Sequence, residues 1–130
     1  MKPVPLKTML VVEIESLPTA KDPEIHEAVL YVLCDQARMP APGIMITGVG
    51  GEMASSERWP FFINKDGRGD WGAACESESE RFFETNLRCK PMKVSELFTV
   101  FGADPDWPGK QIETTFRIRK TTAIAGPVLH

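Results

Sequence analysis

The sequence is poor in the residues that assemble most catalytic and metal sites. Its 130 residues include two histidines, His26 and His130, and three cysteines, Cys34, Cys75 and Cys89. The cysteines are odd in number, widely spaced and without a Cys-x-x-Cys pair, which argues against a structural zinc site or a thioredoxin-type redox pair. We therefore predict no catalytic residue, no metal site and no cofactor, and we expect a non-enzymatic protein.

The chain also lacks a long apolar run and a strong charge of one sign. Its longest apolar stretch, from Ala28 to Cys34, is far shorter than the roughly 20 residues that span a bilayer. The N-terminal MKPVPLKTML has two prolines where a secretory signal needs a continuous apolar core. A formal charge of −3 gives no general attraction to nucleic acid or to anionic membranes. These features predict a soluble cytoplasmic protein with no membrane partner.

What the chain does have is the material for one core. A length of 130 residues and a hydrophobic content of 42% fit a single domain over residues 1–130. We expect the last residues, Gly126–His130, to be a flexible tail. A run of glutamates at alternate positions, Glu76, Glu78 and Glu80, fits either a solvated sheet edge or a mobile linker. The sequence leaves open whether Glu76–Glu80 is ordered.

The first third of the sequence reads as one strand followed by one helix. In LKTMLVVEIESL, Leu10, Val12 and Ile14 alternate with polar residues, which predicts a strand. Asp22 then resembles a helix N-cap, with a proline at the first helical position. Apolar residues follow at helical spacing until the prolines of MPAPG.

The rest of the sequence reads as β. Strand patterns occur in GIMITGV, WPFFIN, WGAAC, RFFETNLRC, MKVSELFTVF and QIETTFRIRKTTAI, with a Gly- and Asp-rich hairpin turn at KDGRGD. The clearest alternation points Ile112, Thr114, Phe116 and Ile118 inward. We therefore predict an α+β fold, in which one N-terminal strand and helix precede a mostly antiparallel sheet or open β-barrel of five to six strands.

The glycine-rich stretch ITGVGGEM invites a comparison with nucleotide-binding loops. A dinucleotide fingerprint needs a third glycine or alanine where this chain has Met53, and it needs a crossover helix before Pro60. The eight residues EMASSERW are too few for that helix. We expect instead a strand that turns sharply at Gly50-Gly51, where a positive φ costs little.

A second candidate surface is a cluster of basic residues on the later strands. Arg88 and Lys90 share one face of a predicted strand, and Arg117 and Arg119 share one face of another. If these strands pair, a cationic patch beside Phe82 would resemble a surface for single-stranded nucleic acid. Glutamates nearby can neutralise the patch, so we do not expect nucleic acid to be the partner.

Aromatic residues at strand ends and in loops are the main functional lead. Trp59, Trp71 and Trp107 all lie beside proline or glycine. They suit either plugs for the ends of a barrel or anchors in an interface. The first hypothesis is a protein-binding or self-associating domain that uses Trp107. The alternative is a small-molecule binder or small enzyme with an apolar pocket between helix and sheet, lined by Trp59, Trp71 and Tyr31.

Overall fold

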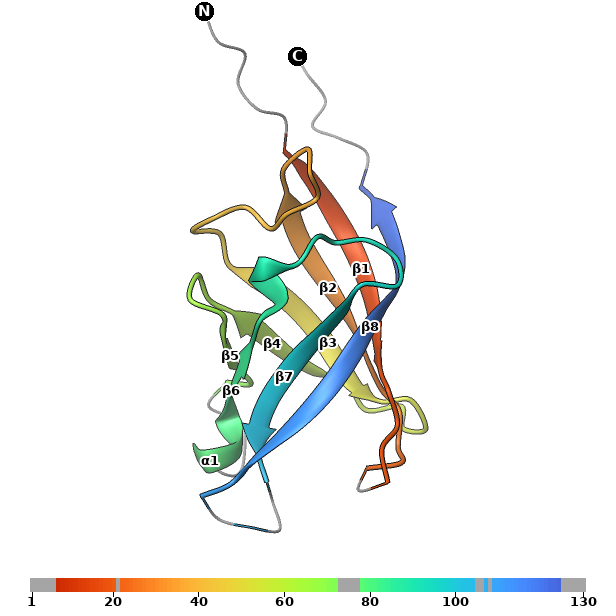
Figure 1. The fold of residues 1–130 in the computed structure, drawn as a ribbon, viewed down its shortest axis with the longest axis vertical. Coiled ribbons are helices and arrows are strands. Elements are labelled where there is room, and N and C mark those ends of the chain that lie inside the picture. The colour runs from red at the N-terminus through yellow and green to blue at the C-terminus, as the bar shows by residue number, and fades with distance from the viewer. Residues whose placement is uncertain (1–6, 21, 73–77, 105–106, 108, 125–130) are drawn as a thin grey trace, which may run out of the picture.

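The chain forms a closed antiparallel barrel of eight strands (Figure 1). The computed structural model describes residues 7–20, 22–72, 78–104, 107 and 109–124. The strands are β1 (Thr8–Ser16), β2 (His26–Cys34), β3 (Ile46–Glu52), β4 (Trp59–Ile63), β5 (Arg68–Asp70), β6 (Phe82–Thr85), β7 (Leu97–Ala103) and β8 (Gln111–Ala123). Each strand pairs with the next, and β8 returns to pair with β1. The short helical segments are α1 (Glu78–Arg81) and η1 (Leu87–Cys89).

The predicted N-terminal helix is wrong, because its residues form strand β2. Ala28, Leu30, Val32 and Cys34 are buried inside the barrel, at a spacing of two. Val29, Tyr31 and Leu33 alternate with them on the outer wall, so apolar side chains occupy both faces and also satisfy a helical spacing. Pairing with β1, as in Leu10 with Val32, decides the outcome, because it buries the apolar face of both strands.

Asp22 does not act as the predicted helix N-cap. It ends the tight connection from β1 to β2: the backbone N–H of Asp22 donates to Thr19 Oγ1 at 2.9 Å, and its Oδ1 accepts from Glu24 N at 3.3 Å. The N–H of His26 then donates to Ser16 Oγ at 2.8 Å and starts the hairpin. The same short polar side chain serves a turn as readily as a helix start.

The predicted α+β fold, with a mostly antiparallel sheet or open β-barrel of five to six strands after the N-terminal strand and helix, is also wrong, since eight antiparallel strands close into a barrel. The glycines of ITGVGGEM do not turn the chain: strand β3 continues through Gly50 and Gly51 to Glu52. The alternation predicted for β1 and β8 is confirmed, with Leu10, Val12, Ile14 and Ile118 in the core. The predicted tail Gly126–His130 lies outside the described residues.

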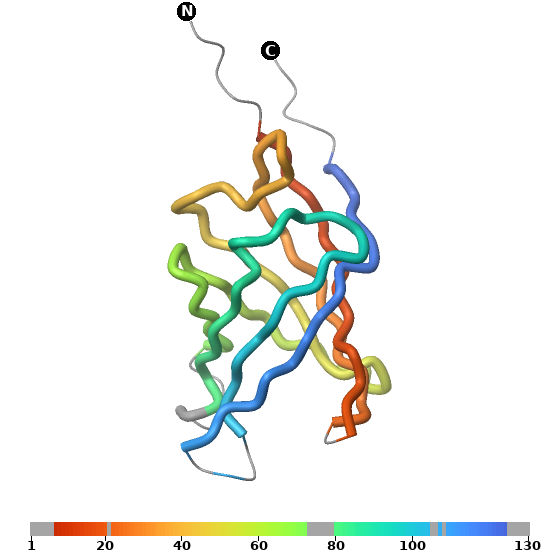
Figure 2. Tube along the Cα trace, viewed as in Figure 1, coloured from red at the N-terminus to blue at the C-terminus, as the bar shows by residue number. Residues whose placement is uncertain are grey.

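The two ends of the barrel differ, and both can be followed along the chain trace (Figure 2). At one end, where β2, β4 and β6 finish, η1 and the segment after it fold over the barrel. We call this the plugged end. Leu87 and Met92 are fully buried there, together with Cys34 and Ala41. Burial raises the pKa of the Cys34 thiol to about 11, as expected for an inert core cysteine.

Arg88 locks the plugged end by donating to backbone carbonyls of two neighbouring connections. Its acceptors are the carbonyl oxygens of Asn64 at 2.5 Å, Ile63 at 3.2 Å, Ala41 at 3.4 Å and Ile44. Burial lowers the pKa of the Arg88 guanidinium. One side chain thereby joins the end of β4 and the connections that follow β2 and β4.

The other end, where β1, β3, β5 and β7 finish, is the open end (Figure 1). No helix in the described part of the chain is long and apolar enough to cross a membrane.

Candidate ligand cavity

A cavity of about 380 Å³ occupies the half of the barrel next to the open end. Its wall is mostly apolar and comes from six strands, β1, β2, β4, β6, β7 and β8, and from residues between strands. The lining side chains include Ile14, Ala28, Leu30, Phe61, Ile63, Trp71, Phe83, Thr85, Leu87, Phe98, Val100, Ile112, Thr114 and Phe116, and Gly102 also lines it. Eight-stranded barrels are just wide enough to be filled by side chains or to hold one small ligand. This barrel is filled at one end and hollow at the other.

Glycines at inward positions explain how aromatic rings line the wall. A Cβ on Gly48 would lie 2.6 Å from Phe61 Cζ and 2.7 Å from a Leu30 methyl group. A Cβ on Gly69 would overlap the Phe83 ring. The rings therefore lie against strands that have no side chain at those points. The glycines of ITGVGG leave space for the aromatic side chains of the cavity wall, and they do not form a phosphate-binding loop.

The aromatic side chains of the wall contact one another in two groups. The Phe61 ring centroid lies 4.9 Å from that of Trp71 and 5.9 Å from that of Phe83, and Trp71 and Phe83 are 5.7 Å apart. Phe98 and Phe116 stack with centroids 5.7 Å apart. Mutual packing of this kind fixes ring positions, so the wall is largely preformed.

Most ionisable side chains that line the cavity are acidic, and the guanidinium groups of Arg68 and Arg81 lie over the ring of Phe82, another lining residue, at 4.1 and 4.8 Å. Among the described residues, the ionisable side chains that line the cavity are Asp22, His26, Glu27 and Glu80, and none is a lysine or arginine. Asp22 and Glu80 reach solvent, which places them at the mouth. Glu27 is already paired, at 2.6 Å with Arg58 and at 3.1 Å with Arg119.

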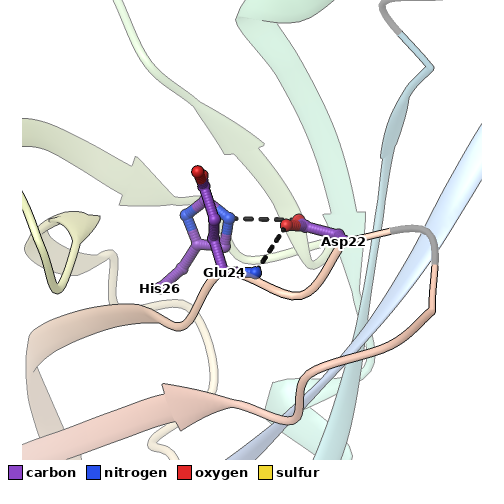
Figure 3. Close-up of side chains that lie close together, drawn as sticks. All are labelled: Asp22, Glu24 and His26. Atoms are coloured by element: carbon purple, nitrogen blue, oxygen red, sulfur yellow. Dashed lines mark hydrogen bonds and ion pairs between the residues drawn. The ribbon is translucent and has the colours of Figure 1, made fainter.

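Asp22, Glu24 and His26 form a compact group at the rim of the cavity (Figure 3). Asp22 and Glu24 lie in the connection before β2, and His26 is the first residue of β2. Asp22 Oδ2 lies 3.1 Å from His26 Nε2, and one ligand atom from each residue lies within 4.8 Å of the others. An imidazole nitrogen with carboxylate oxygens is a donor set that divalent transition metals accept.

A further carboxylate stands beside this group. The negative charge of Glu52 raises the pKa of the Glu24 carboxyl above its ordinary value. Glu52 ends β3 and pairs in register with His26. The rim therefore gathers like charges from two neighbouring strands.

Of the aromatic residues predicted as a ligand or partner surface, Trp71 alone lines the cavity. Tyr31 lies on the outer wall of β2, 41% exposed. Trp59 begins β4 and is 55% exposed, and Trp107 is 59% exposed with the Lys110 ammonium 4.8 Å from its ring centroid. The predicted pocket between helix and sheet does not exist, because there is no such helix; the cavity is inside the barrel.

The four residues of the predicted basic face do not form one cationic surface. Arg88 lies at the plugged end on backbone carbonyls, and Lys90 is 3.9 Å from Glu96. On the outer wall of β8, Arg117 is 2.6 Å from Glu15, and Arg119 contacts Glu13, Glu15 and Glu27. The hydrogen bond from Arg117 lowers the pKa of the Glu15 carboxyl.

Sequence reasoning missed the rim group and most of the wall. Asp22, Glu24 and His26 alternate at a spacing of two, a strand signal that was hidden by the resemblance to a helix start. Phe61 and Phe83 alternate in the same way with Ile63 and Thr85. The sequence pattern of one strand cannot show that the inward faces of several strands surround one cavity.

Comparison with known proteins adds no family: no family model, no curated protein and no solved structure matches this chain.

Proposed function

We propose that this protein binds a small apolar molecule inside its barrel. The observation that carries the proposal is the cavity of about 380 Å³, apolar in its wall and open at one end. Such a hollow is the usual form of a small-molecule site. We propose binding rather than catalysis because the cavity wall consists mainly of hydrocarbon side chains and aromatic rings. The sequence-based expectation of a cytoplasmic location is kept as part of this proposal.

The size of the cavity limits its ligand. At roughly 30 Å³ per water molecule in the liquid, the cavity has room for about a dozen waters. A ligand of about a dozen non-hydrogen atoms is therefore the upper range for complete enclosure. Decan-1-ol, which has about eleven such atoms and absorbs no near-ultraviolet light, is a suitable neutral probe. An affinity of about micromolar is expected for burial of its chain.

The proposal can be tested with one tryptophan as the reporter. The chain has three tryptophans, and only Trp71 lines the cavity. In a Trp59→Phe/Trp107→Phe variant, saturation with decan-1-ol should shift the emission of Trp71 to shorter wavelength, because water leaves its surroundings. The thermal unfolding midpoint should rise as the ligand stabilises the folded state.

A matched control uses the exposed indole. In a Trp59→Phe/Trp71→Phe variant the remaining Trp107 is 59% exposed, and its emission should not respond. If neither the emission of Trp71 nor the unfolding midpoint changes up to the solubility limit of decan-1-ol, the proposal is wrong.

A second candidate function, self-association, is favoured by one feature of the outer wall. Tyr31 pairs with Thr47, Thr47 pairs with Phe62, and Val49 pairs with Pro60, so apolar side chains adjoin across β2, β3 and β4. Tyr31 and Val49 are 41% and 38% exposed. An exposed apolar patch of this kind is typical of contact surfaces.

Sedimentation at increasing concentration tests this candidate. A dimer that Tyr31→Glu dissociates would support contact through the outer wall, and one that only Trp107→Ala dissociates would move the contact to the loop of Trp107. A monomer at every concentration would exclude self-association.

A further inference from the structure

We propose that the ligand of the cavity is an apolar amine, held with its hydrocarbon body among the rings and its cationic group at the acidic rim. This inference rests on the proposed function and adds the chemical class of the ligand.

The wall is unfavourable for an anionic ligand. Apolar molecules in cells often end in a carboxylate, and burying that group without a partner is costly. Among the residues that the structure describes, the lining of this cavity includes no lysine or arginine that could pair with it. The Thr85 hydroxyl is occupied as well: it donates to Thr99 O at 2.8 Å and accepts from Leu87 N at 3.2 Å. A carboxylate would meet like charges at the mouth and apolar atoms inside.

The rim is suited to a cation. Among the three carboxylates that line the cavity, Glu27 is neutralised by Arg58 and Arg119. Asp22 and Glu80 lie at the mouth, and Glu24 stands within 4.8 Å of the Asp22–His26 pair. An ammonium group placed there keeps part of its hydration, so the attraction is not cancelled by full desolvation.

The aromatic wall adds to the same preference. Phe61, Trp71 and Phe83 pack with centroids 4.9 to 5.9 Å apart, which presents several ring surfaces to one ligand. Aromatic faces attract cations through their quadrupole, and aromatic cages are a recurring way to bind alkylated ammonium groups. The hydrocarbon chain next to the ammonium, which shares its positive charge, can lie against these rings.

The plugged end fixes the direction of binding. Leu87 and Met92 are fully buried there and Arg88 fastens the covering segments, so a ligand enters from the open end. Its apolar end goes in first, and its polar group stops at the rim.

The test is a calorimetric titration with three probes of the same chain length: decylamine, decan-1-ol and decanoate, below their micellar concentrations and with a chelator present. We expect decylamine to bind roughly fivefold more tightly than decan-1-ol, and decanoate at least about fivefold more weakly, as typical for partly exposed charge interactions. Equal affinities, or the tightest binding by decanoate, would overturn the inference and leave the proposed function intact. Binding by none of the three would overturn the proposed function itself.

Variants locate the preference. An Asp22→Asn/Glu80→Gln variant should lose most of the preference for decylamine, measured as the ratio of its affinity for decylamine to its affinity for decan-1-ol. Glu96→Gln removes one negative charge near the plugged end, where Glu96 lies 3.9 Å from Lys90, and it should keep the full preference. If the rim variant keeps the preference as well, the cation is not held at the rim and the inference fails.

A divalent metal ion gives a second test. Asp22, Glu24 and His26 can ligate Zn²⁺, and a bound Zn²⁺ ion would repel the ammonium group, so adding Zn²⁺ without the chelator should weaken decylamine binding. Unchanged decylamine binding, with Zn²⁺ shown to be bound at these residues, would count against the inference.

Discussion

The two ends of this barrel are built from the same strands and yet differ in what fills them. On β8, Ile118 is fully buried in the core, while Ile112, on the same face nearer the open end, lines the cavity. On β7, Phe98 is buried and its ring forms part of the cavity wall, while Gly102, further along the same face, lines the cavity without a side chain. A single strand thus contributes a solid core at one level and a hollow at another.

The difference teaches that side-chain size along a strand face decides where a barrel is hollow. Apolar alternation continues through both halves, so hydrophobicity alone does not separate them. Near the plugged end, Leu87 and Met92 come from outside the strands and complete the packing. At the open end, Trp71 reaches in from the segment after β5 but leaves the cavity unfilled, and Gly102 has no side chain there.

The largest expected effect contrasts two isoleucines of one strand face. Ile118→Ala removes a side chain that is fully buried and should lower the free energy of unfolding by about 3 kcal/mol. Ile112→Ala removes the same atoms next to a cavity and should cost about 1 kcal/mol, because little packing is lost. Urea unfolding of both variants measures the contrast. Equal losses would mean that the open half is as densely packed as the plugged half.

The next effect concerns the arginine that fastens the plugged end. Arg88→Lys cannot reproduce the fork of hydrogen bonds to the carbonyls of Asn64, Ile63 and Ala41, and it should cost about 2 kcal/mol. Arg117→Lys, on the outer wall beside Glu15, is the matched control and should cost less than about 0.5 kcal/mol. Similar losses for the two variants would show that Arg88 is an ordinary surface residue.

The smallest effect is a pH dependence near the open end. The hydrogen bond from Arg81 lowers the pKa of the Asp70 carboxyl below its ordinary value of about 3.9. As pH falls, the unfolded state takes up this proton first, so the stabilisation is complete above about pH 4 and is lost below it. Asp70→Asn should therefore be less stable than the parent at neutral pH, and the two should converge in acid.

Urea midpoints across this pH range measure the difference. Asp66→Asn, in the turn between β4 and β5, removes one negative charge from an exposed position and controls for net charge. A gap between parent and Asp70→Asn that stays constant down to pH 2 would show that the ion pair does not carry the effect.

Part of this fold could be predicted from the sequence. The strands β1 and β8 alternate apolar and polar residues over a long stretch, and both predictions are confirmed. The hairpin of β4 and β5 was predicted from its Asp- and Gly-rich turn, although its second strand is Arg68–Asp70 rather than the WGAAC expected. These strands can be recognised in the sequence because one face of each is buried and apolar and the other face is polar.

The remainder depends on partners that are distant in the sequence. Strand β2 has apolar residues on both walls, so its pattern fits a helix equally well until β1 and β3 pair with it. The cavity is lined from inward positions of six strands, and it exists only because the strands close into a barrel. Trp71 was singled out for its place beside a glycine, whereas its role comes from contact with Phe61 and Phe83.

The most direct test of the central claim, that the open half of the barrel is a ligand site, fills the cavity from within. Apart from its chain neighbours, no atom lies within 4 Å of the place where a Cβ on Gly102 would stand, so the first atom of a larger side chain has room, and Gly102→Leu should occupy part of the cavity. Calorimetric titration with decan-1-ol should give about micromolar affinity for the parent and at least roughly tenfold weaker binding for Gly102→Leu. Val49→Leu, on the outer wall, should bind as the parent does. If Gly102→Leu is folded and binds decan-1-ol as tightly as the parent, the ligand does not occupy the barrel and the account is contradicted.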